Sequence, residues 1–191
     1  MADNNTYGSV LDRQSNVSKW GTAWEDKVLG FVNEQLLDNG SDLEVVKGKE
    51  IRKTKAWEKL AIPIKKNGKD DKVEGDLDLV VRNKKNINEP LAVISCKTSL
   101  HGRFSETLFY AVEWKKMIPG IKVFFATPDK GRQAKKGKWE SEWGTEEDPT
   151  KDRSLAAKYL DGVYVGNNRT TLGGVIKNLE DLPRDLITAF R

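Results

Sequence analysis

Two stretches of this chain decide its fold: Glu74-Gly75-Asp76-Leu77-Asp78-Leu79-Val80-Val81 and Leu91-Ala92-Val93-Ile94-Ser95-Cys96-Lys97-Thr98-Ser99. Each contains an apolar run of strand length, which predicts strands at about Glu74–Arg82 and Leu91–Lys97. The polar connection between them is short, and this favours an antiparallel pair. The first strand carries acids and the second ends in a lysine.

Helix and strand patterns continue on both sides of this pair. Apolar residues at helical spacing predict a helix at about Ser18–Leu37, which Asn39-Gly40 ends. Further helices are expected at about Ser105–Met117 and Gly173–Phe190, with a short helix capped by Ser154. Further strands are expected at about Glu44–Ile51, Ile121–Ala126 and Asp161–Val165. Arg52–Asp71 is either a hairpin or a basic loop, because it is rich in lysine and contains the turn pair Asn67-Gly68.

These elements predict an α/β fold, with a central mixed β-sheet flanked by helices. A strand–helix–strand order after Leu91 indicates a right-handed crossover between parallel strands. At 191 residues the chain is expected to form a single domain over 1–191. We expect 1–17 to be a flexible arm and 131–153 to be an insertion that contacts a partner, because neither shows regular periodicity.

Composition excludes several classes of protein. There is no apolar run of membrane length, and the first residues lack a signal peptide's features. The single cysteine excludes an internal disulfide, so we expect a cytoplasmic protein. One histidine argues against catalytic histidine pairs and zinc sites. The net charge of +4 permits a polyanionic partner without requiring one.

The two decisive strands carry the residues for phosphodiester chemistry. Side chains alternate along a strand, so Asp76 and Asp78 share one face, as Ser95 and Lys97 do on the next strand. Mg²⁺ takes oxygen ligands and usually binds one or two carboxylates, waters and phosphate oxygens. A neighbouring lysine can position the attacking water. Acids and lysines at strand ends also occur as solvated caps, but Lys97 follows a strongly apolar run, which indicates an interior strand.

The run Gly75–Val81, followed by Ile94-Ser95-Cys96-Lys97-Thr98-Ser99-Leu100 and Arg103-Phe104, resembles the PD-(D/E)XK nucleases. Within them it looks like type II restriction endonucleases of the branch that reads CCGG or CCWGG sites. The resemblance covers roughly residues 74–127. It implies a restriction-endonuclease-like fold, a Mg²⁺ cofactor, a double-stranded DNA substrate and a prokaryotic source. Asp78 fits the principal metal ligand best, and Asp76 is the reserve choice.

This chain departs from the family's plainest pattern at Ser95, where an acid usually stands. Another carboxylate must therefore complete the site. Glu106 and Glu113 lie seven positions apart on one face of the expected helix, and the resemblance favours Glu113 as catalytic residue and metal ligand. Glu25 is the third candidate, because it falls inside the apolar arc of the first helix and a charge there needs a partner. All three remain open.

DNA contacts are expected from two places. Ser99 and Arg103 lie just after Lys97, and the insertion adds Lys130, Arg132, Gln133 and Lys136. Lysine and arginine supply affinity at phosphates, whereas specificity requires base-edge contacts. Cutting both strands of a duplex normally needs two active sites, so we expect a homodimer. The small size also leaves room for an unlike recognition subunit.

Other functions remain open on the sequence alone. One is a repair or junction nuclease of the same fold. Another is a non-catalytic DNA-binding module, which the serine at position 95 supports.

Overall fold

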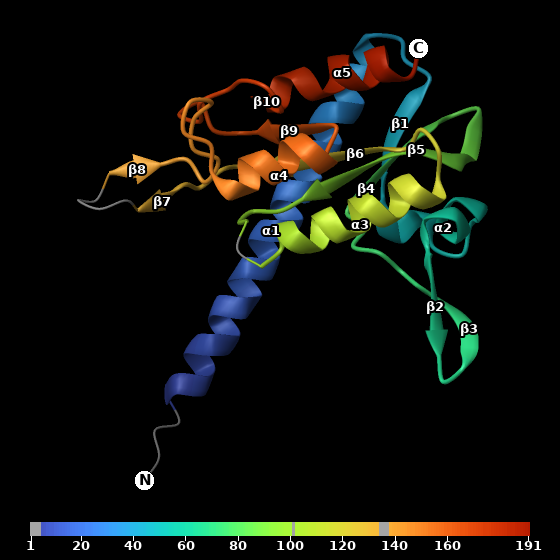
Figure 1. Cartoon of the computed structure of the whole chain (residues 1–191), viewed down its shortest axis with the longest axis horizontal. Helices are drawn as coiled ribbons and strands as arrows, with labels where there is room; N and C mark the ends of the chain where they lie inside the picture. The colour runs from blue at the N-terminus through green and yellow to red at the C-terminus, as the bar shows by residue number, and fades with distance from the viewer. Residues whose placement is uncertain (1–4, 101, 134–137) are drawn as a thin grey trace.

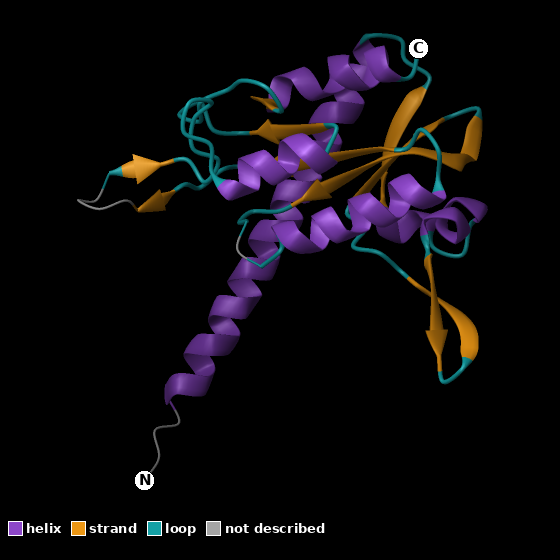
Figure 2. Ribbon diagram, viewed as in Figure 1, coloured by secondary structure: helices purple, strands orange, loops and turns teal. Residues whose placement is uncertain are grey.

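A six-stranded mixed sheet forms the centre of the computed structural model, which describes residues 5–100, 102–133 and 138–191 (Figures 1 and 2). The strand order is β1-β4-β5-β6-β9-β10. These strands are β1 (Leu43–Lys47), β4 (Leu79–Asn83), β5 (Asn86–Cys96), β6 (Lys122–Thr127), β9 (Gly162–Val165) and β10 (Ile176–Asn178). The helices are α1 (Asn5–Asp38), α2 (Lys55–Leu60), α3 (Phe104–Met117), α4 (Lys151–Tyr159) and α5 (Leu182–Ala189). The predicted fold class is confirmed.

The sheet has an antiparallel half and a parallel half. β4 pairs antiparallel with both β1 and β5, as the short connection predicts. β5, β6, β9 and β10 run parallel, so their carboxyl ends meet at one edge of the sheet. The register pairs Leu79 with Ile94. Continued by one residue, it brings Asp78 beside Ser95.

Helices cover both faces of this sheet (Figure 2). On one face, Val28 and Val32 of α1 and Leu186 of α5 pack against strand residues such as Leu79 and Ile94. On the other face, α2, α3 and α4 pack against the sheet. Burial on both faces explains why the central strands read as continuous apolar runs rather than as alternating ones.

Two small hairpins project from the body (Figure 1). One is formed by β2 (Ile62–Lys66) and β3 (Lys69–Val73), and the other by β7 (Arg132–Gln133) and β8 (Trp139–Glu140). Asn67 and Gly68 turn the first hairpin with φ of 52° and 75°, the left-handed backbone that this pair of residues favours. Of the two alternatives for Arg52–Asp71, the hairpin is therefore correct, although α2 precedes it.

The structure corrects several predicted boundaries. α1 already begins at Asn5, so 5–17 is helical and does not form the expected loose arm. The strand expected to reach Ile51 ends at Lys47 and continues as the 3₁₀ helix Gly48–Ile51. Thr150, not Ser154, caps α4, since its side chain accepts a hydrogen bond from the Arg153 N–H.

The C-terminal prediction was wrong over its first half. Gly173–Phe190 was expected to be one helix, but it contains β10, the 3₁₀ helix Leu179–Asp181 and α5. β10 forms because Ile176 is fully buried beside β9, and this tertiary pairing overrides a weak helical pattern. α5 then begins at Leu182, directly after Asp181, with Pro183 in its first turn.

Candidate active site

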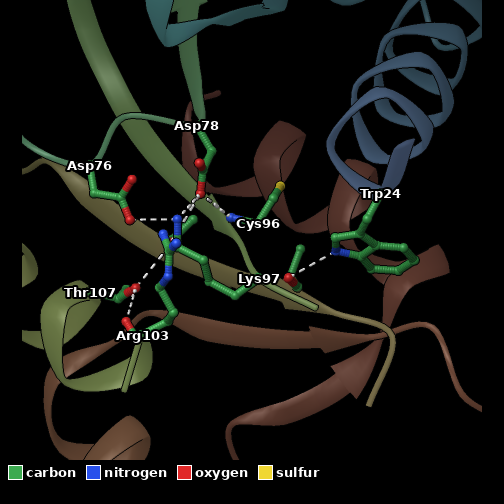
Figure 3. A network of polar contacts seen from close by, with 9 residues as sticks. Trp24, Asp76, Asp78, Cys96, Lys97, Arg103 and Thr107 are labelled. Atoms are coloured by element: carbon green, nitrogen blue, oxygen red, sulfur yellow. Dashed lines mark hydrogen bonds and ion pairs between the residues drawn. The ribbon is translucent and has the colours of Figure 1, made fainter. Parts of the chain in front are cut away.

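The predicted acids and lysine meet where β5 ends at the carboxyl edge of the sheet (Figure 3). Lys97 Nζ lies 2.5 Å from Asp76 Oδ2 and 2.8 Å from Asp78 Oδ2. The Lys97 side chain is only 7% exposed, so one buried ammonium group serves two carboxylates. The structure thus brings together the three predicted side chains, although the strand expected to begin at Glu74 begins only at Leu79 and both acids lie in the irregular segment before it.

Asp78 is the more firmly held of the two acids. Its Oδ2 accepts hydrogen bonds from Lys97 Nζ and, at 2.7 Å, from the Cys96 backbone N–H. Burial raises the pKa of this carboxyl group, while Lys97 acts in the opposite direction and Asp76 adds repulsion. For Lys97, burial lowers the pKa, but the attraction of Asp78 and Asp76 and the hydrogen bond to Asp78 outweigh it, so the pKa is raised. The lysine therefore stays charged at neutral pH.

Asp76 is held differently from Asp78. Its Oδ2 is buried, and the ion pair with Lys97 is not accompanied by a bond of hydrogen-bond geometry. A buried carboxylate oxygen with spare acceptor capacity is costly unless another positive partner approaches it. This oxygen is therefore the best indication that the site holds more than the lysine.

Two glycines fix the irregular segment 74–78 that carries both acids. The Gly48 N–H donates to the Asp78 carbonyl oxygen at 2.9 Å, and a Cβ at Gly48 would lie 2.0 Å from the Leu77 carbonyl oxygen. On the other side, a Cβ at Gly75 would lie 2.6 Å from the Trp114 ring. The segment is therefore packed between the 3₁₀ helix after β1 and the face of α3.

Ser95 takes the place of the usual acid and makes a hydroxyl contact instead. Its Oγ lies 2.9 Å from Thr107 Oγ1 of α3 and 3.4 Å from Asp78 Oδ2, and both hydroxyl side chains are buried. The sequence analysis missed Thr107. The signal was a hydroxyl residue on the buried stripe of α3, between Phe104 and Ala111.

The three candidate glutamates lie in different surroundings. Glu25 of α1 is half-buried and lies 3.7 Å from Lys47 Nζ. Burial raises its pKa, and repulsion from Asp78 is the next cause, which places Glu25 within electrostatic reach of the site.

Glu106 is exposed in the first turn of α3. Together with Asp76 it raises the pKa of Tyr110, although burial of the phenol is the larger cause. Glu113 lies two turns further on and pairs with Lys116 at 2.7 Å. For Glu25, repulsion from Asp78 is thus one of the causes that raise its pKa.

The residues present fit a hard divalent cation. Asp76 and Asp78 supply oxygen ligands, and Mg²⁺ commonly binds only one or two carboxylates and keeps several waters. No cluster of three or more acidic, histidine or cysteine side chains close enough to hold a metal ion occurs among residues 5–100, 102–133 and 138–191. The carboxylates that meet Lys97 in the described part of the chain are those of Asp76 and Asp78.

The predicted DNA-contact residues differ in their exposure and in the partners that they already have. Arg103 is exposed at the start of α3, and Ser99 is half-buried. Lys130 lies over the Trp20 ring, 5.7 Å from its centroid, and Arg132 pairs with Glu140 at 3.3 Å. Gln133 pairs with Trp139 through the β7–β8 backbone, and Lys136 lies outside the described residues.

The mixed sheet and the acid–lysine site at its edge together define a restriction-endonuclease-like nuclease fold. The model of the BsaWI restriction endonuclease type 2 family matches residues 43–185, which is most of the chain. The chain therefore belongs to this family of type II restriction enzymes, and DNA is the partner that the family implies. A search of curated proteins finds no match. No helix in the described part of the chain has the length and apolarity needed to cross a membrane.

Proposed function

We propose that the protein is a Mg²⁺-dependent endonuclease that hydrolyses phosphodiester bonds of double-stranded DNA at a short specific sequence. The observation that carries this proposal is the buried Lys97 ammonium group between the Asp76 and Asp78 carboxylates. The order of an acid strand followed by a strand ending S-C-K-T-S supports assignment to the PD-(D/E)XK superfamily and its CCGG- or CCWGG-reading branch. A prokaryotic cytoplasm is the corresponding location.

Each site residue has a distinct role in this proposal. Asp78 and Asp76 would hold Mg²⁺, which supplies charge neutralisation at the phosphate and lowers the pKa of bound water. Lys97 donates hydrogen bonds that orient the attacking water and stabilise negative charge as it develops. Ser95 is not a ligand but supports Asp78 through its hydroxyl group.

Among the glutamates, we propose Glu25 as the third acid. Its raised pKa and its coupling to Asp78 support this choice. Glu113 is the weaker candidate because Lys116 already pairs with it, and Glu106 is exposed beside Tyr110.

The test is cleavage of plasmid DNA with Mg²⁺ by the wild-type protein and by Lys97→Ala and Asp78→Ala. We expect discrete fragments from the wild type and a loss of rate of roughly 10²- to 10³-fold or more in each variant. Lys122 and Asp161 form a comparable acid–lysine pair, 3.1 Å apart, at the amino ends of β6 and β9, which is the edge of the sheet opposite to Lys97. Lys122→Ala should therefore cut like the wild type. Equal activity in all variants would contradict the proposal.

A non-catalytic DNA-binding module is the second candidate. Ser95 in place of an acid favours it, as does the small number of clustered acids in the described residues. This function predicts specific binding of duplex DNA without cutting at any Mg²⁺ concentration.

A homodimer acting on a palindromic site follows from the need to cut both strands. An unlike recognition subunit would instead make the protein inactive alone and active in its partner's presence. Sedimentation with and without duplex DNA separates these two arrangements.

A further inference from the structure

The loop Gly166–Gly173 is a feature that the site described above does not use. It begins where β9 ends, at the edge of the sheet where β5 delivers Lys97. α1 lies beside the start of the loop, because a Cβ at Gly166 would approach the Trp24 ring to 2.6 Å. Trp24 in turn donates from its indole nitrogen to the Ala126 carbonyl oxygen at 3.0 Å, next to the end of β6 (Figure 3). The loop is therefore on the catalytic edge of the sheet.

Asp129 anchors the first half of this loop. It is fully buried, and its backbone carbonyl accepts a hydrogen bond from the Asn167 side chain at 2.8 Å. The Asp129 carboxylate accepts four hydrogen bonds, from Thr170 Oγ1 at 2.5 Å, Ser141 Oγ at 2.6 Å, the Glu142 N–H at 3.1 Å and the Gly131 N–H at 3.2 Å. One carboxylate thus fixes this loop and the base of the β7–β8 hairpin together.

Arg153 anchors the second half. It is a buried arginine, and its guanidinium group donates to the Thr171 carbonyl oxygen at 3.1 Å and to the Gly173 carbonyl oxygen at 2.9 Å. Because the Arg153 guanidinium group donates to two backbone carbonyl oxygens of the loop, it fixes the path of the loop backbone. Both ends of the loop are therefore held by buried polar side chains.

The exposed tip of the loop presents Asn168 and Arg169. Among the hydrogen bonds and ion pairs of the described residues, Arg169 contributes only its backbone N–H, to Asn167 Oδ1 at 3.0 Å. Two of the basic residues expected to read DNA near the neighbouring hairpin are already engaged, since Arg132 pairs with Glu140 and Lys130 lies over Trp20. Among the described residues, the Arg169 guanidinium group forms no ion pair or side-chain hydrogen bond.

We propose that the loop Gly166–Gly173 reads DNA sequence, with Arg169 as a base-contacting residue and Asp129 and Arg153 as positioning residues. This proposal rests on duplex DNA being the partner of the catalytic edge. Arginine binds guanine bidentately in the major groove, and asparagine binds adenine in the same way. Such contacts require a rigid support, whereas phosphate contacts tolerate mobile side chains. The buried anchors supply that rigidity.

The test is selection of bound duplexes from a random-sequence pool by the wild-type protein, Arg169→Ala and Arg169→Lys. We expect the wild type to enrich a defined site and both variants to lose preference at one base pair, by roughly 10- to 100-fold. The control is Arg184→Ala on α5, which removes another exposed arginine, one that pairs with Asp181 away from this edge, and should keep the wild-type preference. Thermal unfolding confirms that each variant is folded.

Three results would overturn the proposal. The first is no sequence preference in the wild type, and the second is an unchanged preference in Arg169→Ala. The third is that Arg169→Ala binds all sequences more weakly by the same factor while Arg169→Lys binds like the wild type. The last result identifies a phosphate contact. Cleavage is measured separately on the selected site. Sequence preference that depends on Arg169, without any cutting, would refute the nuclease function and leave the loop assignment standing.

Discussion

At the scale of single residues, the site buries more negative charge than one lysine neutralises. Two carboxylates share one buried ammonium group, and burial raises the pKa of Asp78 although Lys97 is bonded to it. A third acid, Glu25, repels the same carboxylate. A surplus of buried negative charge is costly for the free protein, and a cation would relieve it.

Magnesium is therefore expected to stabilise the folded protein. At a concentration about 100 times its Kd, it should raise the free energy of unfolding by about 2.7 kcal/mol. Thermal unfolding of the wild type, Asp78→Asn and Asp161→Asn across a Mg²⁺ titration measures this effect. Asp161→Asn should respond like the wild type, and Asp78→Asn should lose most of the response. An equal response in Asp78→Asn would place the metal elsewhere.

Glu25 predicts a pH-dependent gain in stability when its charge is removed. Because its pKa is raised in the folded protein, mainly by burial, the folded state holds the proton more tightly than the unfolded state. Stability therefore falls as the pH rises from the ordinary glutamate pKa, about 4.3, through the folded value, and the cost remains at higher pH. Glu25→Gln should raise the Tm at pH 7 and have little effect near pH 4.

Thermal unfolding of Glu25→Gln between pH 4 and pH 8 checks this prediction. The control is Glu34→Gln, an exposed position on the same helix, which should leave the Tm nearly unchanged. If Glu25 completes the metal site, the same variant also loses cleavage, so stability and activity move in opposite directions. A Tm lower than that of the wild type at pH 7 would show that the Lys47 ion pair outweighs burial.

At the scale of elements, the position of both acids depends on glycines rather than on strand pairing. Gly48→Ala is expected to destabilise the protein by at least about 1–3 kcal/mol, since the added Cβ meets the Leu77 backbone and one of the two must move. It should also lower the cleavage rate, because the segment that moves carries Asp76 and Asp78. Unfolding and cleavage assays on the same sample measure both effects.

Gly30→Ala is the matched control for this substitution. Gly30 lies within α1 with no atom within 4 Å of an added Cβ, so alanine should stabilise the helix by up to about 1 kcal/mol. Its cleavage rate should not change. A Gly48→Ala protein with wild-type stability and activity would show that the segment is not held at this point.

Some of these elements could be predicted from the sequence, and the reason is physical. The strands that carry Lys97 and Val123 are buried on both faces, and continuous apolar runs of their length indicate that directly. The pairing of Asp76 and Asp78 with Lys97 was predicted from strand alternation, but the strand expected from Glu74 begins only at Leu79. The irregular segment that carries both acids is held by contacts with Gly48 and Trp114, which leave no local pattern in the sequence. β10 and the anchors Asp129 and Thr107 could not be predicted, because their partners come from distant segments and leave no local pattern.

At the scale of the whole molecule, one edge of the sheet collects what a sequence-specific nuclease needs. Lys97 follows β5, the β7–β8 hairpin follows β6, and the Arg169 loop follows β9 (Figure 1). α1 crosses beside this edge and brings Glu25 with it. Because the edge belongs to the parallel half of the sheet, a single DNA duplex could meet the catalytic and the sequence-reading residues together.

Mapping the DNA ends produced by the wild-type protein with Mg²⁺, beside Lys97→Ala, tests the central claim most directly. The expected result is cutting at one short sequence, with ends related by twofold symmetry, and no such ends from Lys97→Ala. Ends at random positions, or identical ends from both proteins, would contradict the assignment of Asp78 and Lys97 as the site of cleavage.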